Sequence, residues 1–324
     1  MKNLIFILLF VFSFVPVKCH VVFHRDLKPI DTVEVVEIGG IKQFVKIQGA
    51  DRTKPIMLFL HGGPGSSLIP VADAFTSQLK EHFVVVQWDQ RETGETLKLN
   101  SSPVPLSLDL FQKDASQLVH YLLQKYNRKK LFLVSHSFGS MIGFDLAEKH
   151  PDLLYAYVCI SGIIDQRKSE RLTMDMLNKW AKKTGNHPAE KELSLVHLPF
   201  ESGEDLYYSQ KWLFIHNGAE FASKHDFSEK YHQWLSVWFP MWKNSVIKNL
   251  FTSLPALQCP VYFIEGIGDQ QKSHYIVKEY YDFIKAPKKN FFWFKKSGHT
   301  IFNSEPEKLQ QTMIKKILPK TFPN

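Results

Sequence analysis

The segment LVSHSFGS, residues 133–140, places three serines and a histidine within eight positions. An apolar run precedes this segment, and a pattern typical of a helix follows it. A serine in a tight turn between a strand and a helix is lifted above the sheet, at the positive end of the helix dipole. Ser137 occupies that place, and the small residues Ser135 and Gly139 flank it. We therefore predict that Ser137 is a nucleophile.

A general base for Ser137 must come from elsewhere in the chain. Side chains of adjacent residues around a sharp turn point apart, whereas a base must come within about 3 Å of the nucleophile oxygen, which argues against His136. The segment KKSGHT supplies His299 after the last apolar run of the sequence. A histidine at this position, after a serine and an acidic residue earlier in the chain, completes the order in which the three residues of a catalytic triad can occur. We predict His299 as the base.

The acid of such a triad orients the imidazole and stabilises it when it is protonated. The segment VYFIEGIGDQQ places Asp269 shortly after the apolar run at 261–264. His299 follows the next apolar run, at 291–294. Glu265 in the same segment and Asp165 after an earlier run are the competing carboxylates. We expect Asp269 to be the acid.

Glycines after another apolar run are suited to an oxyanion hole. The segment FLHGGPGSS, residues 59–67, lets the main chain approach a tetrahedral oxyanion closely. We predict that an N–H from this loop, at Gly63, pairs with the N–H of Phe138. The spacing of cysteine and histidine does not resemble a zinc site, so we expect neither a metal nor a cofactor.

The elements that must position these residues follow from the apolar pattern. Fully apolar strands separated by helical patterns indicate a parallel sheet covered by helices on both faces. An alternating hairpin at 32–38 and 42–47 adds two antiparallel strands, which makes eight. The six apolar runs lie at 56–60, 83–88, 131–134, 155–160, 261–264 and 291–294.

The strand pattern stops between about 164 and 250. This region is mostly helical in character and contains five of the seven tryptophans. Trp234, Trp238 and Trp242 follow each other at four-residue intervals and share one helical face. Two interpretations remain open: the stripe is core, or part of it lines a pocket beneath an inserted cap.

Together these motifs resemble the α/β-hydrolase superfamily, and more narrowly the proline iminopeptidase family. The motifs are HGGPG at 61–65, WDQR at 88–91, the elbow at Ser137, Asp269, and SGH at 297–299. The resemblance implies an α/β-hydrolase fold, with an eight-stranded mostly parallel sheet, helices on both faces and an inserted helical cap. It also implies a serine triad without metal and the release of N-terminal residues, notably proline, from short peptides.

The chain departs from the family pattern at several positions. Glu92 follows Asp-Gln-Arg where the family usually has glycine, and the elbow has Ser135, His136 and Phe138 where Gly-Gly-Ser-Trp-Gly is usual. Phe239 stands where the family's cap has a glutamate that helps to hold the free amino group of the substrate.

A free amine that enters a closed cap loses water, which is costly unless a carboxylate meets it. Glu201, Glu204 and Asp205 are the carboxylates of the cap that could do so, and we predict that Trp238 lines the substrate site with Glu201 and Glu204. If none of them holds the amine, the alternative is a carboxylesterase with the same triad. A non-catalytic binding protein of this fold is a third hypothesis, against which the intact triad argues.

The N-terminus, MKNLIFILLFVFSFVPVKC, has an early lysine and then an apolar run at 4–17. The run is short for a membrane span, which needs about 20 residues, and fits the core of a signal peptide cleaved before His20. We expect a secreted or periplasmic protein with no stable membrane insertion after cleavage. The predicted divisions are a signal peptide at 1–19, the hydrolase core at 20–163 and 251–324, and the cap at 164–250.

The composition fits a globular protein, with 44% apolar and 22% charged residues in a chain of 324. The net charge of +8 is spread over short lysine pairs. Because no basic run is interleaved with aromatic residues, we expect no nucleic-acid partner. The expected partner is a small-molecule or short-peptide substrate.

Overall fold

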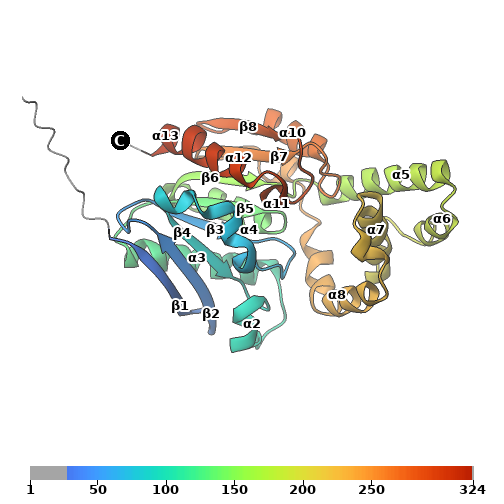
Figure 1. Ribbon diagram of the computed structural model, residues 1–324, viewed down its shortest axis with the longest axis horizontal. Coiled ribbons are helices and arrows are strands. Elements are labelled where there is room, and N and C mark those ends of the chain that lie inside the picture. The colour runs from blue at the N-terminus through green and yellow to red at the C-terminus, as the bar shows by residue number, and fades with distance from the viewer. Residues whose placement is uncertain (1–27, 323–324) are drawn as a thin grey trace, which may run out of the picture.

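The computed structural model describes residues 28–322, so the predicted signal peptide lies outside the described residues. Eight strands form one sheet in the order β1-β2-β4-β3-β5-β6-β7-β8 (Figure 1). The pairs β1–β2 and β2–β4 are antiparallel and the others are parallel. The strands are β1 (Ile30–Ile38), β2 (Ile41–Gly49), β3 (Ile56–Leu60), β4 (Val84–Asp89), β5 (Leu131–His136), β6 (Leu154–Ile160), β7 (Val261–Gly266) and β8 (Lys289–Phe294).

Helices cover both faces of this sheet and continue into a separate group (Figure 1). The α-helices are α1 (Ala72–Thr76), α2 (Gly94–Leu99), α3 (Leu108–Lys125), α4 (Gly139–Lys149), α5 (Gln166–Thr184), α6 (His187–Leu193), α7 (Gly203–His216), α8 (His225–Ser245), α9 (Leu250–Ser253), α10 (His274–Phe283), α11 (Ile301–Ser304), α12 (Pro306–Thr312) and α13 (Leu318–Thr321). Short 3₁₀ turns are η1 (Ile69–Val71), η2 (Leu79–Glu81), η3 (Pro151–Leu153) and η4 (Glu220–Ser223), and η5 (Met313–Ile317) is a π-helical turn.

The inner strands are apolar throughout because both of their faces are covered. All five residues of β3 are buried. Leu58 and Leu60 join the apolar cluster under α3, α4 and α10, whereas Met57 and Phe59 join the cluster under α1 and α12. This alternation is the two-residue period of a strand with helices on each side. The predicted eight-stranded α/β architecture is confirmed.

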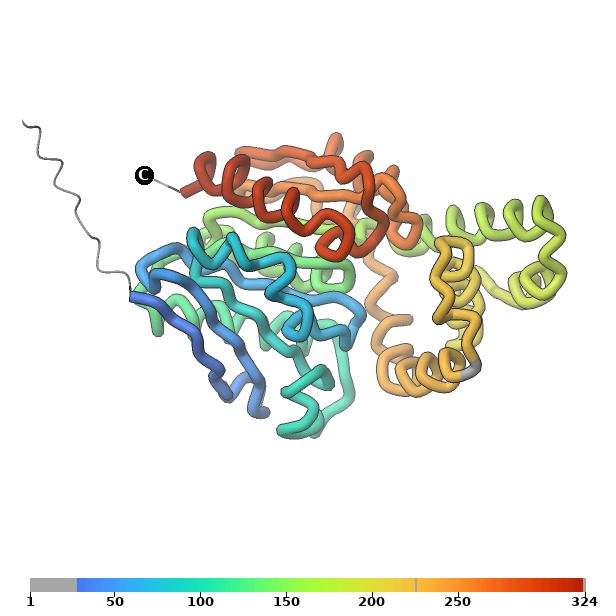
Figure 2. The backbone as a smooth tube through the Cα atoms, viewed as in Figure 1, coloured from blue at the N-terminus to red at the C-terminus, as the bar shows by residue number. Residues whose placement is uncertain are grey.

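The helices α5 to α8 stand apart from the sheet, beyond one end of it (Figures 1 and 2). The chain leaves the sheet after β6 and returns after α8. Asp165 caps α5 by accepting a hydrogen bond from the backbone N–H of Lys168 at 2.9 Å, and its other carboxylate oxygen accepts from the Asn249 side chain at 2.8 Å. Asp165 therefore joins the entry and exit of the helical segment, and it makes no contact with His299.

The WDQR motif of the sequence has a structural role at the edge of the sheet. Arg91 and Asp114 are both fully buried, with Arg91 Nε 2.5 Å from Asp114 Oδ2. Arg91 also donates to the carbonyl of Gly39 in the β1–β2 turn, at 2.5 Å, and Gln43 donates to Asp114. A buried ion pair needs such additional hydrogen bonds to offset the loss of solvation. The network attaches the N-terminal hairpin to α3.

No helix within residues 28–322 is long and apolar enough to cross a membrane.

Candidate active site

Ser137 lies at the turn from β5 into α4 with its backbone in the left-handed region, at φ 52°. A residue with a side chain rarely adopts this conformation, which costs on the order of 1–3 kcal/mol. Only small residues fit around the turn. A Cβ on Gly139 would clash with the Leu60 carbonyl oxygen, and one on Gly62 would lie 2.9 Å from the Ser137 Cβ. The close approach of two backbones therefore fixes the position of Ser137.

The three serines of this segment have different environments. Ser135 forms a buried hydrogen bond with the Tyr157 hydroxyl at 2.7 Å, and the Ser140 hydroxyl accepts from the backbone N–H of Ile163 at 2.8 Å. Ser137 lines a cavity of about 560 Å³ beside α8. It is the serine of this segment with its hydroxyl available to a substrate.

The structure brings His299 and Asp269 together from two loops. His299 Nδ1 lies 2.7 Å from Asp269 Oδ2. The other carboxylate oxygen accepts the backbone N–H groups of Gln271 and Lys272, at 2.9 and 3.2 Å. Burial alone would raise the pKa of Asp269, but the charge and hydrogen bond of His299, with these N–H groups, hold the pKa below its ordinary value. Asp269 is therefore ionised and orients the imidazole.

Glu265 lies near Asp269 and does not take its place. Both Glu265 carboxyl oxygens are buried and receive no hydrogen bond from a donor among the described residues. Burial raises the pKa of Glu265 well above its usual value, and the charge of Asp269 acts in the same direction. Glu265 is a neutral acid beside an ionised one, and it has no hydrogen bond to His299.

His299 and Ser137 line the same cavity. No hydrogen bond links their side chains in the described part of the chain. Catalytic hydrogen bonds are often long without substrate and shorten in the complex. The arrangement is suited to general-base activation of a serine hydroxyl.

His136 has a different position from the one a base would need. Its Nε2 lies 3.0 Å from the backbone carbonyl oxygen of His299, so this nitrogen carries the proton and donates. The Ser161 hydroxyl donates to the same carbonyl at 3.0 Å. Burial, and secondarily the charge of His299, lowers the pKa of His136 to about 3. His136 is a neutral residue that positions the His299 loop.

The glycine loop carries the predicted oxyanion donor. Gly63 lines the cavity with φ 108°, a conformation that glycine favours, and Phe138 is the N-cap residue of α4. The first N–H groups of a helix have no partner within it and favour negative charge. His61 supports the loop: its Nε2 accepts the Gln90 N–H at 3.2 Å, and its Nδ1 lies 3.0 Å from the Gly62 carbonyl oxygen.

Two departures from the family pattern have a local explanation. Glu92, where the family usually has glycine, has a left-handed backbone at φ 52°, and its carboxylate accepts the N–H of Ser102 at 2.5 Å. The backbone conformation that favours glycine is thus kept with another residue. Ser135 fits in place of the first elbow glycine because its hydroxyl reaches Tyr157.

The tryptophan stripe on α8 has two functions. Trp234 donates from Nε1 to the Pro64 carbonyl at 2.8 Å, and Trp238 packs against Gly65, where a Cβ would lie 2.7 Å from the indole. Trp234 and Trp242 line the cavity, whereas Trp238 is buried behind the glycine loop and is not among the lining residues. Both sequence interpretations therefore apply, to different tryptophans.

The cap carboxylates that the sequence singled out do not line this cavity. Glu204 lies on the surface and pairs with His232, with 2.6 Å between Oε1 and Nε2. Asp205 caps α7 together with Ser202. Glu201 lines a neighbouring hollow instead. The structure does not bring these residues together with Ser137.

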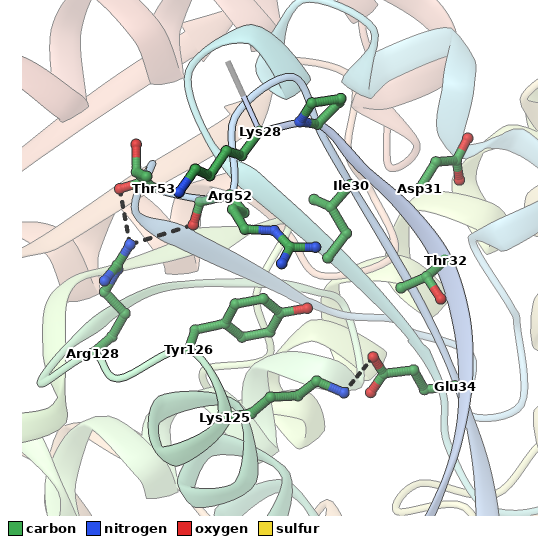
Figure 3. Close-up of a pocket in the computed structure, with 11 residues that line it drawn as sticks. Lys28, Ile30, Asp31, Thr32, Glu34, Arg52, Thr53, Lys125, Tyr126 and Arg128 are labelled. Carbon is green, nitrogen blue, oxygen red and sulfur yellow. Dashed lines mark hydrogen bonds and ion pairs between the residues drawn. The ribbon is translucent and has the colours of Figure 1, made fainter. Parts of the chain in front are cut away.

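A second hollow, of about 650 Å³, lies away from the cavity that Ser137 lines (Figure 3). The start of β1, the β2–β3 loop and the end of α3 form it. Lys28, Arg52 and Arg128 lie around it, and Lys125 pairs with Glu34 at 2.5 Å. Within residues 28–322 no serine, cysteine or histidine lines this hollow, and Ser137 and His299 lie elsewhere.

Sequence reasoning missed several residues of the cavity wall, among them Gln166 and Lys272. Gln166 begins α5, and Lys272 lies three residues after Asp269. The position of Lys272 behind a predicted triad acid was the one available signal, but spacing alone does not indicate whether a lysine faces solvent or a cavity.

The family model of the α/β hydrolase fold matches residues 55–306, and the chain belongs to this family. A curated relative, named "Probable aminopeptidase YbaC" from Bacillus subtilis strain 168, is 28% identical over 313 residues. That alignment covers 89% of this chain and 96% of the relative. The chain is thus similar to a hydrolase over nearly the full length of both.

Two solved structures share the fold. VinJ superposes with a TM-score of 0.63 at 19% identity, over 88% of this chain and 98% of VinJ. A proline iminopeptidase-related protein from Thermus thermophilus gives 0.59 at 18% identity, over 90% of this chain and 98% of that one. The resemblance to this group of α/β hydrolases that the motifs indicate is confirmed.

The buried histidines predict an acid-sensitive fold. Burial lowers the pKa of His61 to about 4 and that of His136 to about 3, from 6.5. The unfolded chain binds protons at higher pH than the folded one, so the stabilisation is complete above pH 6.5 and falls as pH decreases from 6.5 to these values. At pH 5 the free energy of unfolding should be lower by about 2 kcal/mol for each histidine.

Urea unfolding of wild type and His61→Gln between pH 7.5 and 5 measures this effect. The variant should lose about 2 kcal/mol less than wild type over that range. His187→Gln, at a position where the side chain is 86% exposed, is the control and should follow wild type. Equal losses in wild type and His61→Gln would contradict the assignment.

Proposed function

We propose that this protein is a serine hydrolase in which Ser137 is the nucleophile, His299 the general base and Asp269 the acid. The observation that carries the proposal is that a strained serine and a carboxylate-oriented imidazole line one cavity. Gly63 lines the same space, and Phe138, the N-cap residue of α4, directly follows Ser137 in the chain. The non-catalytic hypothesis gives no reason for this combination.

The reaction follows from these groups. Ser137 Oγ attacks the substrate carbonyl carbon while its proton passes to His299 Nε2. The carbonyl oxygen becomes an oxyanion that accepts hydrogen bonds from the N–H groups of Gly63 and Phe138. The leaving group departs with the proton from His299, which leaves an ester on Ser137. A water molecule, deprotonated by His299, then attacks this ester, which releases the carboxylic acid product and restores the Ser137 hydroxyl. Asp269 stabilises the imidazolium of His299 in both acylation and deacylation.

For the substrate, we propose an N-terminal aminoacyl group on a short peptide, released as by an aminopeptidase of the proline iminopeptidase kind. The support is the similarity to a relative named as a probable aminopeptidase, over most of both chains. The cavity of about 560 Å³ is of a size for one residue and part of the next.

A carboxylesterase is the second candidate, and one observation favours it. Within the described residues, the cavity wall contains no aspartate or glutamate. A free amine there would lack the carboxylate that offsets its loss of hydration. A neutral acyl ester has no such requirement.

Labelling by a fluorophosphonate tests the nucleophile. Wild type should be labelled, and Ser137→Ala should lose both labelling and at least about 10⁴-fold in kcat. Ser135→Ala is the matched control, because that hydroxyl is bound to Tyr157, and it should remain labelled. Labelling that persists in Ser137→Ala would refute the assignment.

Paired substrates separate the two candidates. We expect prolyl and alanyl arylamides with a free amino group to be cleaved faster than the same compounds with an acetylated amine. With no carboxylate on the described cavity wall, the acceptor for the ammonium is a neutral oxygen such as the Gln210 amide oxygen, and a charge-assisted hydrogen bond to it corresponds to roughly a tenfold to hundredfold difference in kcat/KM. Equal turnover of free and acetylated arylamides, with rapid cleavage of short acyl esters, would establish the esterase instead.

We also propose export, with the first 19 residues removed. The support is the apolar run at 4–17 after an early lysine. N-terminal sequencing of the exported protein should begin at about His20. Recovery of a chain that begins with Met1 in a membrane fraction would contradict cleavage.

A further inference from the structure

One lysine of the cavity wall has no function in the proposed reaction. Lys272 is 7% exposed and lines the cavity together with Ser137 and His299. A buried ammonium loses much of its hydration and requires compensation. The groups around the Lys272 ammonium therefore indicate which kind of substrate group the cavity binds.

The ammonium of Lys272 is only partly compensated by the protein. Its Nζ donates one hydrogen bond to Gln166 Oε1 at 3.1 Å and lies 4.9 Å from the ring centre of Trp242. Within the described chain no carboxylate lies within ion-pair distance of it. Burial lowers the pKa of Lys272 to about 8, and the more distant charges of Asp269 and Glu170 oppose that shift. At neutral pH the side chain is charged and has unused donors.

The backbone of Lys272 is held on both sides. Its N–H donates to Asp269 Oδ1 at 3.2 Å, and its carbonyl accepts from the Ser169 hydroxyl on α5 at 2.9 Å. These bonds attach Lys272 to the triad acid and to the helical segment together. The backbone that carries the ammonium is thus fixed relative to Asp269.

A second donor lies next to the ammonium. Trp242 is 4% exposed and lines the cavity, and its indole N–H has no acceptor among the described residues. The ammonium lies over the ring face and is not paired with a carboxylate among the described residues, so its free N–H groups are complementary to an anion. The remaining charged lysine of the wall, Lys230, is exposed and pairs with Asp226.

We propose that Lys272, with the ring of Trp242 beside it, forms a carboxylate-binding subsite, so that the preferred substrates carry a carboxylate near the scissile carbonyl. The proposal rests on the proposed function, because it places the subsite beside Ser137. A bound carboxylate supplies the counter-charge that the buried ammonium lacks. Gln166, whose amide donates to Glu170 at 3.2 Å and accepts from Lys272, keeps the ammonium in place.

The carboxylate has two possible sources in a substrate. It belongs to the leaving group in a dipeptide with a free C-terminus, and to the acyl group in a half-ester of a dicarboxylic acid. Two matched pairs distinguish them. The first is prolyl-glycine against prolyl-glycinamide, and the second is the 4-nitrophenyl half-ester of glutaric acid against its methyl ester.

In wild type, kcat/KM should favour the anionic member of one pair by roughly 10- to 100-fold. Lys272→Met should reduce this ratio by the same factor, and Lys272→Arg should retain most of it. Lys230→Met is the matched control, since it removes a cavity lysine that is already paired, and its ratio should equal that of wild type. A ratio near one for both pairs in wild type, or an unchanged ratio in Lys272→Met, overturns the proposal.

Fluorophosphonate labelling of each variant separates a failed subsite from a failed nucleophile or a misfolded protein. Labelled wild type without an anionic preference refutes the subsite and leaves the serine hydrolase intact. Calorimetric titration with 5-oxohexanoate, a ketone with the same spacing of carboxylate and carbonyl as the half-ester but no leaving group, tests the subsite without turnover. Binding should be at least about tenfold weaker in Lys272→Met than in wild type, and equal binding overturns the proposal even where Ser137 is unreactive.

Discussion

The close approach of two backbones at the ends of β3 and β5 is the constraint on which the site depends. Gly62 and Gly139 have no side chains, and this allows the loop after β3 to lie against the turn that holds Ser137. The same approach brings Gly63 and Ser137, which directly precedes the N-cap residue of α4, to one cavity. A left-handed serine is costly by itself, and the buried strands on both sides maintain it. The positions of the candidate nucleophile and of the proposed oxyanion donor at Gly63 thus result from a single packing requirement.

Burial then assigns different roles to groups of the same type. His61 and His136 are enclosed and lose the tendency to take up a proton, so they act as neutral hydrogen-bonding supports for the glycine loop and for the carbonyl of His299. His299 lies 2.7 Å from an ionised carboxylate, and this hydrogen bond fixes the orientation of its ring. Asp269 and Glu265 also differ: hydrogen-bond donors keep the pKa of Asp269 low, whereas burial and the charge of Asp269 raise the pKa of Glu265 and keep it neutral.

The sequence was sufficient for the sheet and for the candidate triad residues, and much less so for the cavity wall. Continuous apolar runs such as 56–60 predict buried parallel strands because both faces must be covered, and the chain order of parallel strands determines which loops meet at their carboxyl ends. Ser137, Asp269 and His299 lie on such loops. The wall depends instead on how α5 and α8 turn toward the sheet. Periodicity alone could not distinguish Glu204, which reaches solvent and His232, from Lys272, which faces the cavity.

A crystal structure of the protein after reaction with a phosphonate inhibitor tests the central claim most directly. We expect a covalent bond from phosphorus to Ser137 Oγ. We also expect a phosphoryl oxygen about 3 Å from the backbone nitrogens of Gly63 and Phe138, with His299 still bonded to Asp269. An adduct on Ser135 or Ser140, or a phosphoryl oxygen directed away from both nitrogens, would contradict this claim.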